Sequence, residues 1–429
     1  MRILLILIFL VVANVTAMGQ QRLLGIVVNE KGQPLPKASV FVAESKIGTI
    51  TDTTGNFILQ IGPIEKCKLI VSYVGYETQI KFINVKEENT LIKFELQPVS
   101  KQLKDVIVRS RKNDDWKHWG KIFTDAFVGN SAFATQCSVL NEDAIGFTYD
   151  EATNTLRAYA TEPILVKNED LGYLLTISLV DFTLHTTDND VDYQGYYLFK
   201  ELTGDPKKRD TWEQNRRRAY ALSFMHFVRA LYNGKLKEDG FEVRAFKTPG
   251  RAEAERVKKI YDQRLAHYTD SLNHENNELA VKLTEKSFNK DTLKYYKTAL
   301  GKIANVKLSA PLNPEDIAIK NDGKYVALKF KDQIQVTYKK IKEPEEYYNF
   351  RNQAALNTSA VDLHSTDIAA NELVMPQKNN PYTELQLTKN IPVELSVSGY
   401  INNTNLYMNG FWGWWEKVAT KLPYDYQPF

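Results

Sequence analysis

The chain has 429 residues, of which 43% are hydrophobic and 25% are charged. Its 55 lysines and arginines nearly balance its 52 aspartates and glutamates, so no overall positive field recruits nucleic acid. The two cysteines, Cys67 and Cys137, are too few for a disulfide framework. The sequence leaves open whether they pair, and it favours buried apolar thiols.

The first predicted element is a secretory signal peptide over residues 1–19. Arg2 precedes an apolar run over residues 3–13, and small residues follow at Ala17 and Gly19. A basic start, a short apolar core and a small-residue cleavage site are typical of export signals. No later stretch approaches the roughly 20 apolar residues of a membrane helix, so we expect no transmembrane segment after cleavage. The expected location is periplasmic or outer-membrane-associated.

Residues 20–99 are predicted to form a small β-sandwich. Short segments rich in β-branched and aromatic residues recur there, and Gly, Pro, Asn or Asp lies between most of them. The segments are LLGIVV, ASVFVA, FILQI, CKLIVSYV, TQIKFI and LIKFEL. Short strands at such spacing are typical of a sandwich.

Three motifs in this segment carry a family resemblance. They are Gly32-x-Pro34-Leu35-x-x-Ala38, Asp52-x-x-Gly55-x-Phe57 and Tyr73-x-Gly75-Tyr76, in that order. The segment resembles the carboxypeptidase regulatory-like domain, a seven-stranded transthyretin-like β-sandwich that is frequent in exported proteins of Bacteroidota. Physically, these motif residues have scaffold roles. Asp52 can bond backbone amides of a turn, Gly55 can adopt a positive φ, and Phe57 can begin a buried strand face.

The remaining chain is predicted to contain four regions. They are a charged linker over 100–115, an α+β domain over 116–247, a charged helical insertion over 248–302 and a β-rich C-terminal region with an aromatic cap over 303–429. In the α+β domain, apolar spacing predicts a helix of about three turns after the linker and a second helix over 210–231, with antiparallel strands between them. The predicted fold class is therefore a multidomain, β-rich α+β protein.

The predicted strands beyond the sandwich lie in two groups. The first comprises AIGFTYD, TLRAYAT, ILVKN, YLLTISLVDFTLHT, YQGYYLFKEL and FEVRAFK. The second comprises YVALKF, IQVTYKKI, VDLHS, ELVM, TELQL and VELSVSGYI. The closing stretch WGWWEKVATKLPYDYQP is similar to the end of an uncharacterised group of exported Bacteroidota proteins, a similarity that implies no activity.

Histidine spacing argues against a zinc peptidase. The zinc carboxypeptidases that the regulatory-like domain accompanies take two metal ligands from His-x-x-Glu. None of the six histidines here is followed by Glu at i+3 or by His at i+4. Phosphate-binding glycine motifs are also absent. We therefore expect no metal, no cofactor and no catalytic residue.

Two alternatives stay open. Ser223, His226 and Arg229 could serve an envelope hydrolase of unrecognised type if they converge in an open pocket, although packing with a polar edge is the commoner role for such a helix. The tryptophans Trp412, Trp414 and Trp415 could bind a glycan if at least two indole faces are exposed, whereas buried indoles would only close a core.

The sequence as a whole predicts a non-catalytic protein. A known accessory domain follows an export signal, and the zinc and phosphate motifs are not matched. We expect an exported binding or scaffolding protein of the bacterial cell envelope, with another envelope protein or a glycan as its partner.

Overall fold

A computed structural model describes most of the chain. The described residues are 21–62, 64, 66–85, 91–99, 112–187, 189–246, 251–272, 276–299, 308–359, 378–401 and 405–428. The predicted signal peptide and most of the predicted linker lie outside them.

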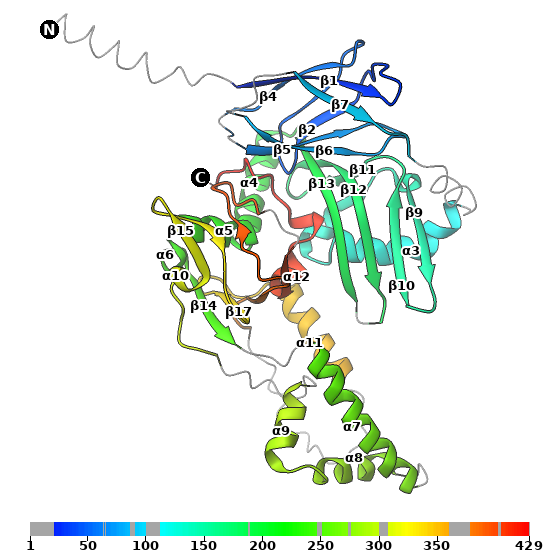
Figure 1. Ribbon diagram of the computed structural model, residues 1–429, viewed down its shortest axis with the longest axis vertical. Helices are drawn as coiled ribbons and strands as arrows, with labels where there is room; N and C mark the ends of the chain where they lie inside the picture. The colour runs from blue at the N-terminus through cyan, green and yellow to red at the C-terminus, as the bar shows by residue number, and fades with distance from the viewer. Residues whose placement is uncertain are drawn as a thin grey trace, which may run out of the picture. The chain divides into compact units, whose positions relative to one another are not determined.

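Seven strands form the predicted N-terminal sandwich within the described part of residues 21–99. They are β1 (Arg22–Asn29), β2 (Ser39–Val42), β3 (Gly48–Ile50), β4 (Asn56–Gln60), β5 (Lys66–Ser72), β6 (Gln79–Asn84) and β7 (Ile92–Leu96). One sheet has the order β4-β1-β7 and the other β3-β2-β5-β6, and Figure 1 shows them as two layers. Alternate residues of both sheets point inward, where Val27, Val40 and Phe94 are fully buried.

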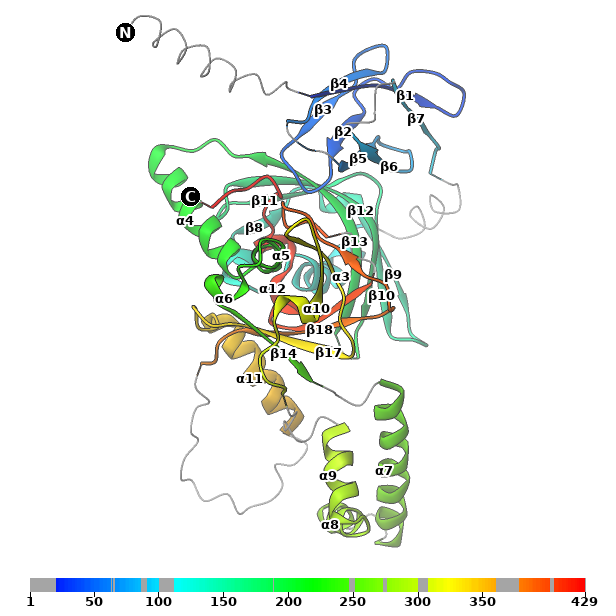
Figure 2. The same cartoon turned by 60° about the vertical axis from the view of Figure 1, so that its left-hand side comes forward.

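A six-stranded antiparallel sheet follows the sandwich. Its strands are β8 (Cys137–Val139), β9 (Ile145–Asp150), β10 (Thr155–Ala160), β11 (Ile164–Asn168), β12 (Tyr173–His185) and β13 (Asp190–Glu201). The long strand β12 pairs with β11 and β10 on one side and with β13 on the other. Figure 2 shows this central sheet with α3 (Lys112–Phe127) beside it.

Helix α3 packs its aromatic stripe on one face of the central sheet. Phe123 stacks on Phe127 at 5.0 Å between ring centroids and meets Phe182 edge to face at 4.9 Å. The helix begins at Lys112, inside the region predicted as a linker. The helix therefore begins four residues before Trp116, the first aromatic residue of the predicted stripe.

The predicted helix over 210–231 is two helices. These are α4 (Pro206–Ala221) and α5 (Phe224–Tyr232). Ser223 has an extended backbone with ψ 156° and caps α5, because its hydroxyl accepts a hydrogen bond from the backbone N of His226. The apolar spacing continues through residues 210–231, but the helix does not, because Ser223 begins a second helix as its N-cap.

The chain divides into two compact units that differ from the predicted domains. One unit is Met1–Ala221 with Glu416–Phe429, and the other is Leu222–Trp415. The predicted boundaries at 247 and 303 do not coincide with these units, because β14 (Phe241–Phe246) pairs with β17 (Gln333–Tyr338) instead of joining the central sheet.

The second unit contains two further sheets and a helical insertion. The sheets have the orders β14-β17-β18-β20 and β15-β16-β19. The remaining strands are β15 (Ala318–Asn321), β16 (Lys324–Leu328), β18 (Tyr382–Leu387), β19 (Val393–Glu394) and β20 (Leu406–Gly410). The insertion consists of α7 (Arg251–Ser271), α8 (Asn277–Lys286) and α9 (Lys290–Ala299), which Figures 1 and 2 show packed together.

One strand prediction in this unit is corrected, and one helix lies where none was predicted. The stretch VELSVSGYI forms only β19 and an isolated bridge between Leu395 and Ile401, because the chain turns at Gly399 with φ +83°. Helix α11 (Glu345–Ser359) lies in a region predicted to be β-rich. The predicted strands VDLHS and ELVM fall outside the described residues. Short helices complete the unit: α6 (Leu236–Asp239), α10 (Pro314–Ile317) and α12 (Phe411–Trp415).

Among the described residues, no helix combines the length and the apolar character that crossing a membrane requires.

Candidate functional site at the sandwich junction

The loop between β2 and β3 attaches the sandwich to the edge of the central sheet. The backbone N of Glu44 donates to Tyr197 O at 2.8 Å, and Phe199 N donates to Ser45 O at 2.9 Å. The loop thereby makes a parallel bridge between Ser45 and Leu198 of β13. The Ser45 hydroxyl stabilises the loop internally, since it donates to Val42 O and accepts from Ile47 N.

The C-terminal segment holds the other side of this loop. Tyr424 N donates to Glu44 O at 2.8 Å, and Lys46 N donates to Asp425 Oδ1 at 3.3 Å. The segment is itself anchored on the central sheet, because the buried Asn168 side chain donates to Ala419 O at 2.9 Å. The loop therefore lies between β13 and residues that follow it by more than 370 positions in the chain.

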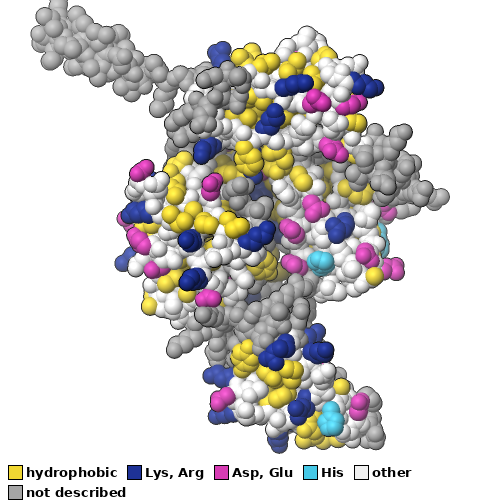
Figure 3. Space-filling model, viewed as in Figure 1, with side chains coloured by type: hydrophobic (Ala, Val, Ile, Leu, Met, Phe, Trp, Pro, Cys, Tyr) yellow, Lys and Arg dark blue, Asp and Glu magenta, His cyan; other side chains and the backbone are white. Residues whose placement is uncertain are grey.

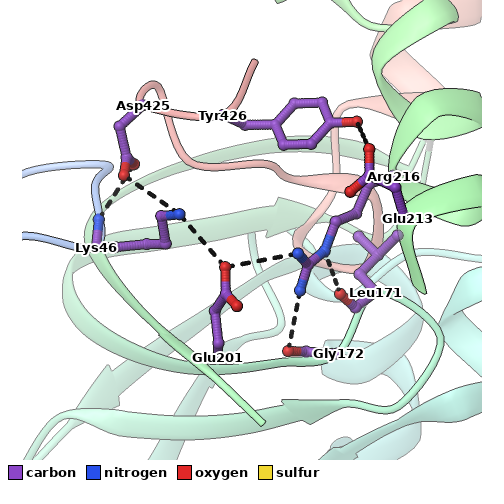
Figure 4. A network of polar contacts seen from close by, with 8 residues as sticks. All are labelled: Lys46, Leu171, Gly172, Glu201, Glu213, Arg216, Asp425 and Tyr426. Carbon is purple, nitrogen blue, oxygen red and sulfur yellow. Dashed lines mark hydrogen bonds and ion pairs between the residues drawn. The ribbon is translucent and has the colours of Figure 1, made fainter. Parts of the chain in front are cut away.

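Side-chain ion pairs surround the same loop, as Figure 4 shows. Lys46 Nζ lies 3.3 Å from Glu201 Oε1 and 3.6 Å from Asp425 Oδ2. The side chains of Lys46 and Glu201 are 36% and 51% exposed, so solvent screens their attraction. Each such pair contributes at most about 1 kcal/mol. The ion pairs therefore add little to the stability of the junction. Their main effect is to determine which charged residues lie next to the loop.

Arg216 of α4 is the buried member of the network. Its Nε donates to Leu171 O at 2.8 Å, its Nη1 lies 3.5 Å from Glu201 Oε1, and its guanidinium carbon lies 4.0 Å from the ring centroid of Tyr173. Figure 4 shows the guanidinium reaching both the Leu171 and the Gly172 carbonyls. The arginine thus braces the turn that leads into β12.

Glu44 has an unusual backbone and an unusual carboxyl group. Its φ of +59° is in the left-handed region, which few non-glycine residues adopt. The residue is half-buried, and burial raises the pKa of its carboxyl from 4.5 to about 7 despite the attraction of Lys421 and Lys68. The cost of desolvating the carboxylate therefore exceeds that attraction.

Two lysines of the C-terminal segment have opposite pKa shifts. Burial, followed by repulsion from Lys421, lowers the pKa of Lys417 to about 8. Burial also acts to lower the pKa of Lys421, but Tyr193, Glu44 and Glu416 together raise it above the ordinary value. The junction therefore combines backbone and ion-pair contacts with the carboxyl group of Glu44, whose pKa is raised.

The predicted scaffold motif forms a closed turn in the sandwich. Asp52 Oδ1 accepts hydrogen bonds from Thr54 N at 2.8 Å and Asn56 N at 3.0 Å. A further bond from the Thr54 hydroxyl is the main reason why the pKa of Asp52 lies below its usual range. Phe57 is 3% exposed and packs near Phe94.

Gly75 of the third motif also lies in a turn. It has φ +82°, and its carbonyl accepts a hydrogen bond from Val99 N at 3.0 Å.

We expect Gly55→Ala to lower the free energy of unfolding of the sandwich by about 2 kcal/mol. Gly55 has φ +76°, and an added Cβ would lie 2.6 Å from Val27 O. Gly32→Ala is the matched control, because Gly32 has φ +74° but no atom within 4 Å of an added Cβ. The control should cost about 1 kcal/mol. Urea denaturation measures both, and equal losses would contradict a role for the close approach to Val27.

The three candidate tryptophans lie in a packed aromatic cluster. Trp412, Trp414 and Trp415 are 4%, 7% and 1% exposed. Trp412 lies 5.0 Å from Phe224 between ring centroids and donates its indole N–H to Leu222 O. The exposed indole faces that a glycan site requires are therefore not formed. The one-turn helix α12 buries all three because each indole finds an aromatic neighbour within its own unit.

The hydrolase candidates have structural contacts. Ser223 caps α5 through the backbone N of His226, at 3.1 Å. The His226 ring packs edge to face on Phe241 and Tyr338, and Arg229 Nε donates to Ser398 O at 2.9 Å. The serine and the arginine are buried, which is the arrangement expected for packing with a polar edge.

The cysteines are two free thiols. Each is half-buried, and burial raises the pKa of Cys67 to about 11 and that of Cys137 to about 12. Because the thiolate is the reactive form, neither has the character of a nucleophile. Among the described ranges, no group of three or more His, Cys, Asp or Glu residues is placed to hold a metal ion.

Sequence reasoning missed the junction residues Glu44, Lys46, Glu201, Arg216 and Asp425. Arg216 is one of three consecutive cations in the sequence, and consecutive residues of a helix point to different faces. A partial signal was available, because Arg216 alone among them follows the apolar spacing set by Trp212 and Tyr220.

Comparison with known families bears on the sandwich. Residues 23–108 match the model of the CarboxypepD_reg-like domain, which confirms the resemblance carried by the three motifs. The match extends past residue 99 into the region predicted as a linker. A comparison with curated proteins found no match to this chain.

Proposed function

We propose that this chain, whose residues 23–108 match the carboxypeptidase regulatory-like domain, is an exported, non-catalytic binding or scaffolding protein of the bacterial cell envelope. The observation that carries the proposal is the junction. The domain is held through β13, the C-terminal segment and the ion pairs of Lys46, which fix its orientation on the central sheet.

Attachment of the sandwich to the central sheet is consistent with a role in binding a partner. An accessory domain on a flexible linker explores many orientations, and a partner then has to overcome that entropy on binding. A docked domain presents its free strands in one orientation, which lowers that cost. The candidate catalytic serine instead has a capping role, and the aromatic cluster has a packing role.

Export is supported by the apolar, singly basic N-terminal stretch. We expect the chain, expressed with a C-terminal tag in a bacterium with two membranes, to accumulate outside the cytoplasm and to lack its first residues by mass spectrometry. Ile8→Arg places a charge in the apolar core and should retain the full-length chain in the cytoplasm. Ile8→Leu is the control and should be exported like the wild type.

The opposite distribution would contradict the proposal. A wild-type chain that stays in the cytoplasm with an intact N-terminus would exclude an envelope role, whichever surface binds a partner.

A further inference from the structure

A single helical turn in the C-terminal segment has a lysine at each end. The turn is η4 (Val418–Thr420), and Lys417 and Lys421 are the residues directly before and after it. Ala419 within the turn is held on both sides, because its backbone N donates to a carbonyl of the first unit and its O accepts from the buried side chain of Asn168 at 2.9 Å. The two lysine side chains therefore start from a fixed piece of backbone.

Both lysines lie beside aromatic rings of β13 and lack an acceptor for their ammonium groups. Lys417 Nζ lies 5.4 Å from the centroid of the Tyr193 ring, and Lys421 Nζ lies 5.1 Å from that of Tyr197. Within the part of the chain that the structure describes, neither ammonium group forms a hydrogen bond or an ion pair. Each side chain is half-buried. A half-buried ammonium group without an acceptor is poorly solvated, which favours binding of an anion.

The charges around this pair are mixed in sign. The acidic groups that act on Lys421 are Tyr193, Glu44 and Glu416. Lys417 is compensated less, because repulsion by Lys421 outweighs attraction by Asp190. On the face that Figure 3 shows, basic and acidic side chains are likewise interspersed, so no broad positive field draws anions to the molecule. A local site between the two lysines is therefore the place where an anion replaces repulsion with attraction.

We propose that the ammonium groups of Lys417 and Lys421 together bind one oxyanion group of a ligand, a carboxylate or a phosphate, beside the aromatic rings of β13. This inference rests on the proposed binding role of the chain and names the chemical class of the ligand. A ligand with an apolar or planar part next to its oxyanion group can also contact the tyrosine rings.

Glu44 makes the affinity for an anion depend on pH. Its carboxyl faces Lys421 and Lys68, and burial raises its pKa to about 7. Above that pH the carboxylate competes with the bound anion for Lys421, and below it the neutral carboxyl does not. Burial and repulsion by Lys421 lower the pKa of Lys417 to about 8, so this lysine also loses its charge in alkaline solution. Both groups therefore strengthen anion binding as the pH falls from 8.5 to 6.

Isothermal titration calorimetry with sulfate, on the chain lacking residues 1–19, tests the proposal. Sulfate keeps its charge between pH 6 and pH 8.5, so a change of affinity in this range comes from the protein. At constant ionic strength, we expect wild type to bind one sulfate ion at least about threefold more tightly at pH 6 than at pH 8.5. Lys417→Met should weaken binding at pH 6 at least about tenfold. Glu44→Gln should match wild type at pH 6 and bind at least about twofold more tightly at pH 8.5.

Lys117→Met is the matched control. Lys117 is exposed on α3, ten residues before the end of that helix, which is about 15 Å along its axis. Lys417 packs at that end, because an added Cβ at Gly129 would lie 2.8 Å from the Lys417 Cβ. The charge of Lys117 is therefore screened from the site, and its loss should leave the affinity for sulfate within about twofold of wild type.

Phenyl phosphate and phthalate, both dianions at pH 7, then distinguish the two kinds of ligand. Tighter binding of the first identifies a phosphate site, and tighter binding of the second a carboxylate site. No binding of sulfate by wild type, equal affinities of Lys417→Met and wild type, or weaker binding by Glu44→Gln would overturn the proposal. Because the titration uses purified protein, its failure is distinct from a failure of export.

Discussion

Replacing Arg216 with alanine should lower the local free energy of unfolding around β12 by about 3–4 kcal/mol. The change removes a charge-assisted hydrogen bond to Leu171 O and the cation that lies on the Tyr173 ring, and it leaves both partners buried. It also removes the arginine stem from a site where the residue is 8% exposed. Hydrogen exchange of peptides that cover β12, read by mass spectrometry, measures this local opening.

The neighbouring arginine is the control. Arg217 lies one position further along α4, its side chain is 53% exposed, and it pairs with Glu213 on the same helix. Arg217→Ala should cost less than about 0.5 kcal/mol. Arg216→Lys keeps the charge but not the planar fork, so it should recover less than half of the loss. Equal effects of the two alanine variants would show that the guanidinium of Arg216 does not brace the sheet.

Most strands of the first unit were predictable because their patterns are local, and only the three-residue strands β3 and β8 were missed among those described. The predicted stretch YLLTISLVDFTLHT differs from β12 by one residue at its end. Buried and less buried side chains alternate on each side of a β-bulge between Leu179 and Asp181, and Phe182 packs on α3. A period of two is typical of a strand. The motifs of the sandwich likewise predicted turns whose hydrogen bonds lie within a few residues. Local chemistry was sufficient in both cases.

Long-range contacts explain what the sequence did not predict. The C-terminal segment joins the unit that begins the chain, because Ala419 N donates to Val128 O and Tyr424 N donates to Glu44 O. Pairings across hundreds of residues leave no periodicity in the sequence. Burial of the tryptophans has the same origin, since the aromatic neighbours of α12 come from α5 and α11. A WGWW stretch has the same composition whether it is exposed or packed.

The candidate site was the least predictable feature. Lys46, Glu201 and Asp425 are ordinary charged residues that become a network only when three segments meet. Residue types carry chemical information when a reaction fixes their spacing, as in a metal motif. A contact that only holds chain segments together imposes no such spacing. It requires only complementary charges at the places where the chain segments meet.

Glu44 should make the first unit lose stability as the pH rises from 4.5 to about 7. The folded chain binds the Glu44 proton more tightly than the unfolded chain, whose carboxyl has the ordinary pKa of 4.5. The stabilising contribution is therefore complete below pH 4.5 and is lost as the pH passes the folded-state pKa. The rise in the pKa from 4.5 to about 7 corresponds to about 3 kcal/mol.

Glu44→Gln isolates this contribution from other titrating groups. Glutamine keeps the size of the protonated carboxyl and the left-handed backbone of the residue, so the variant should match wild type at pH 4.5. At pH 7.5 it should be more stable than wild type by up to about 3 kcal/mol. Urea denaturation at several pH values measures the difference. Parallel curves for Glu44→Gln and wild type would mean that Glu44 is ionised in the folded chain and that Lys421 and Lys68 compensate its desolvation in full.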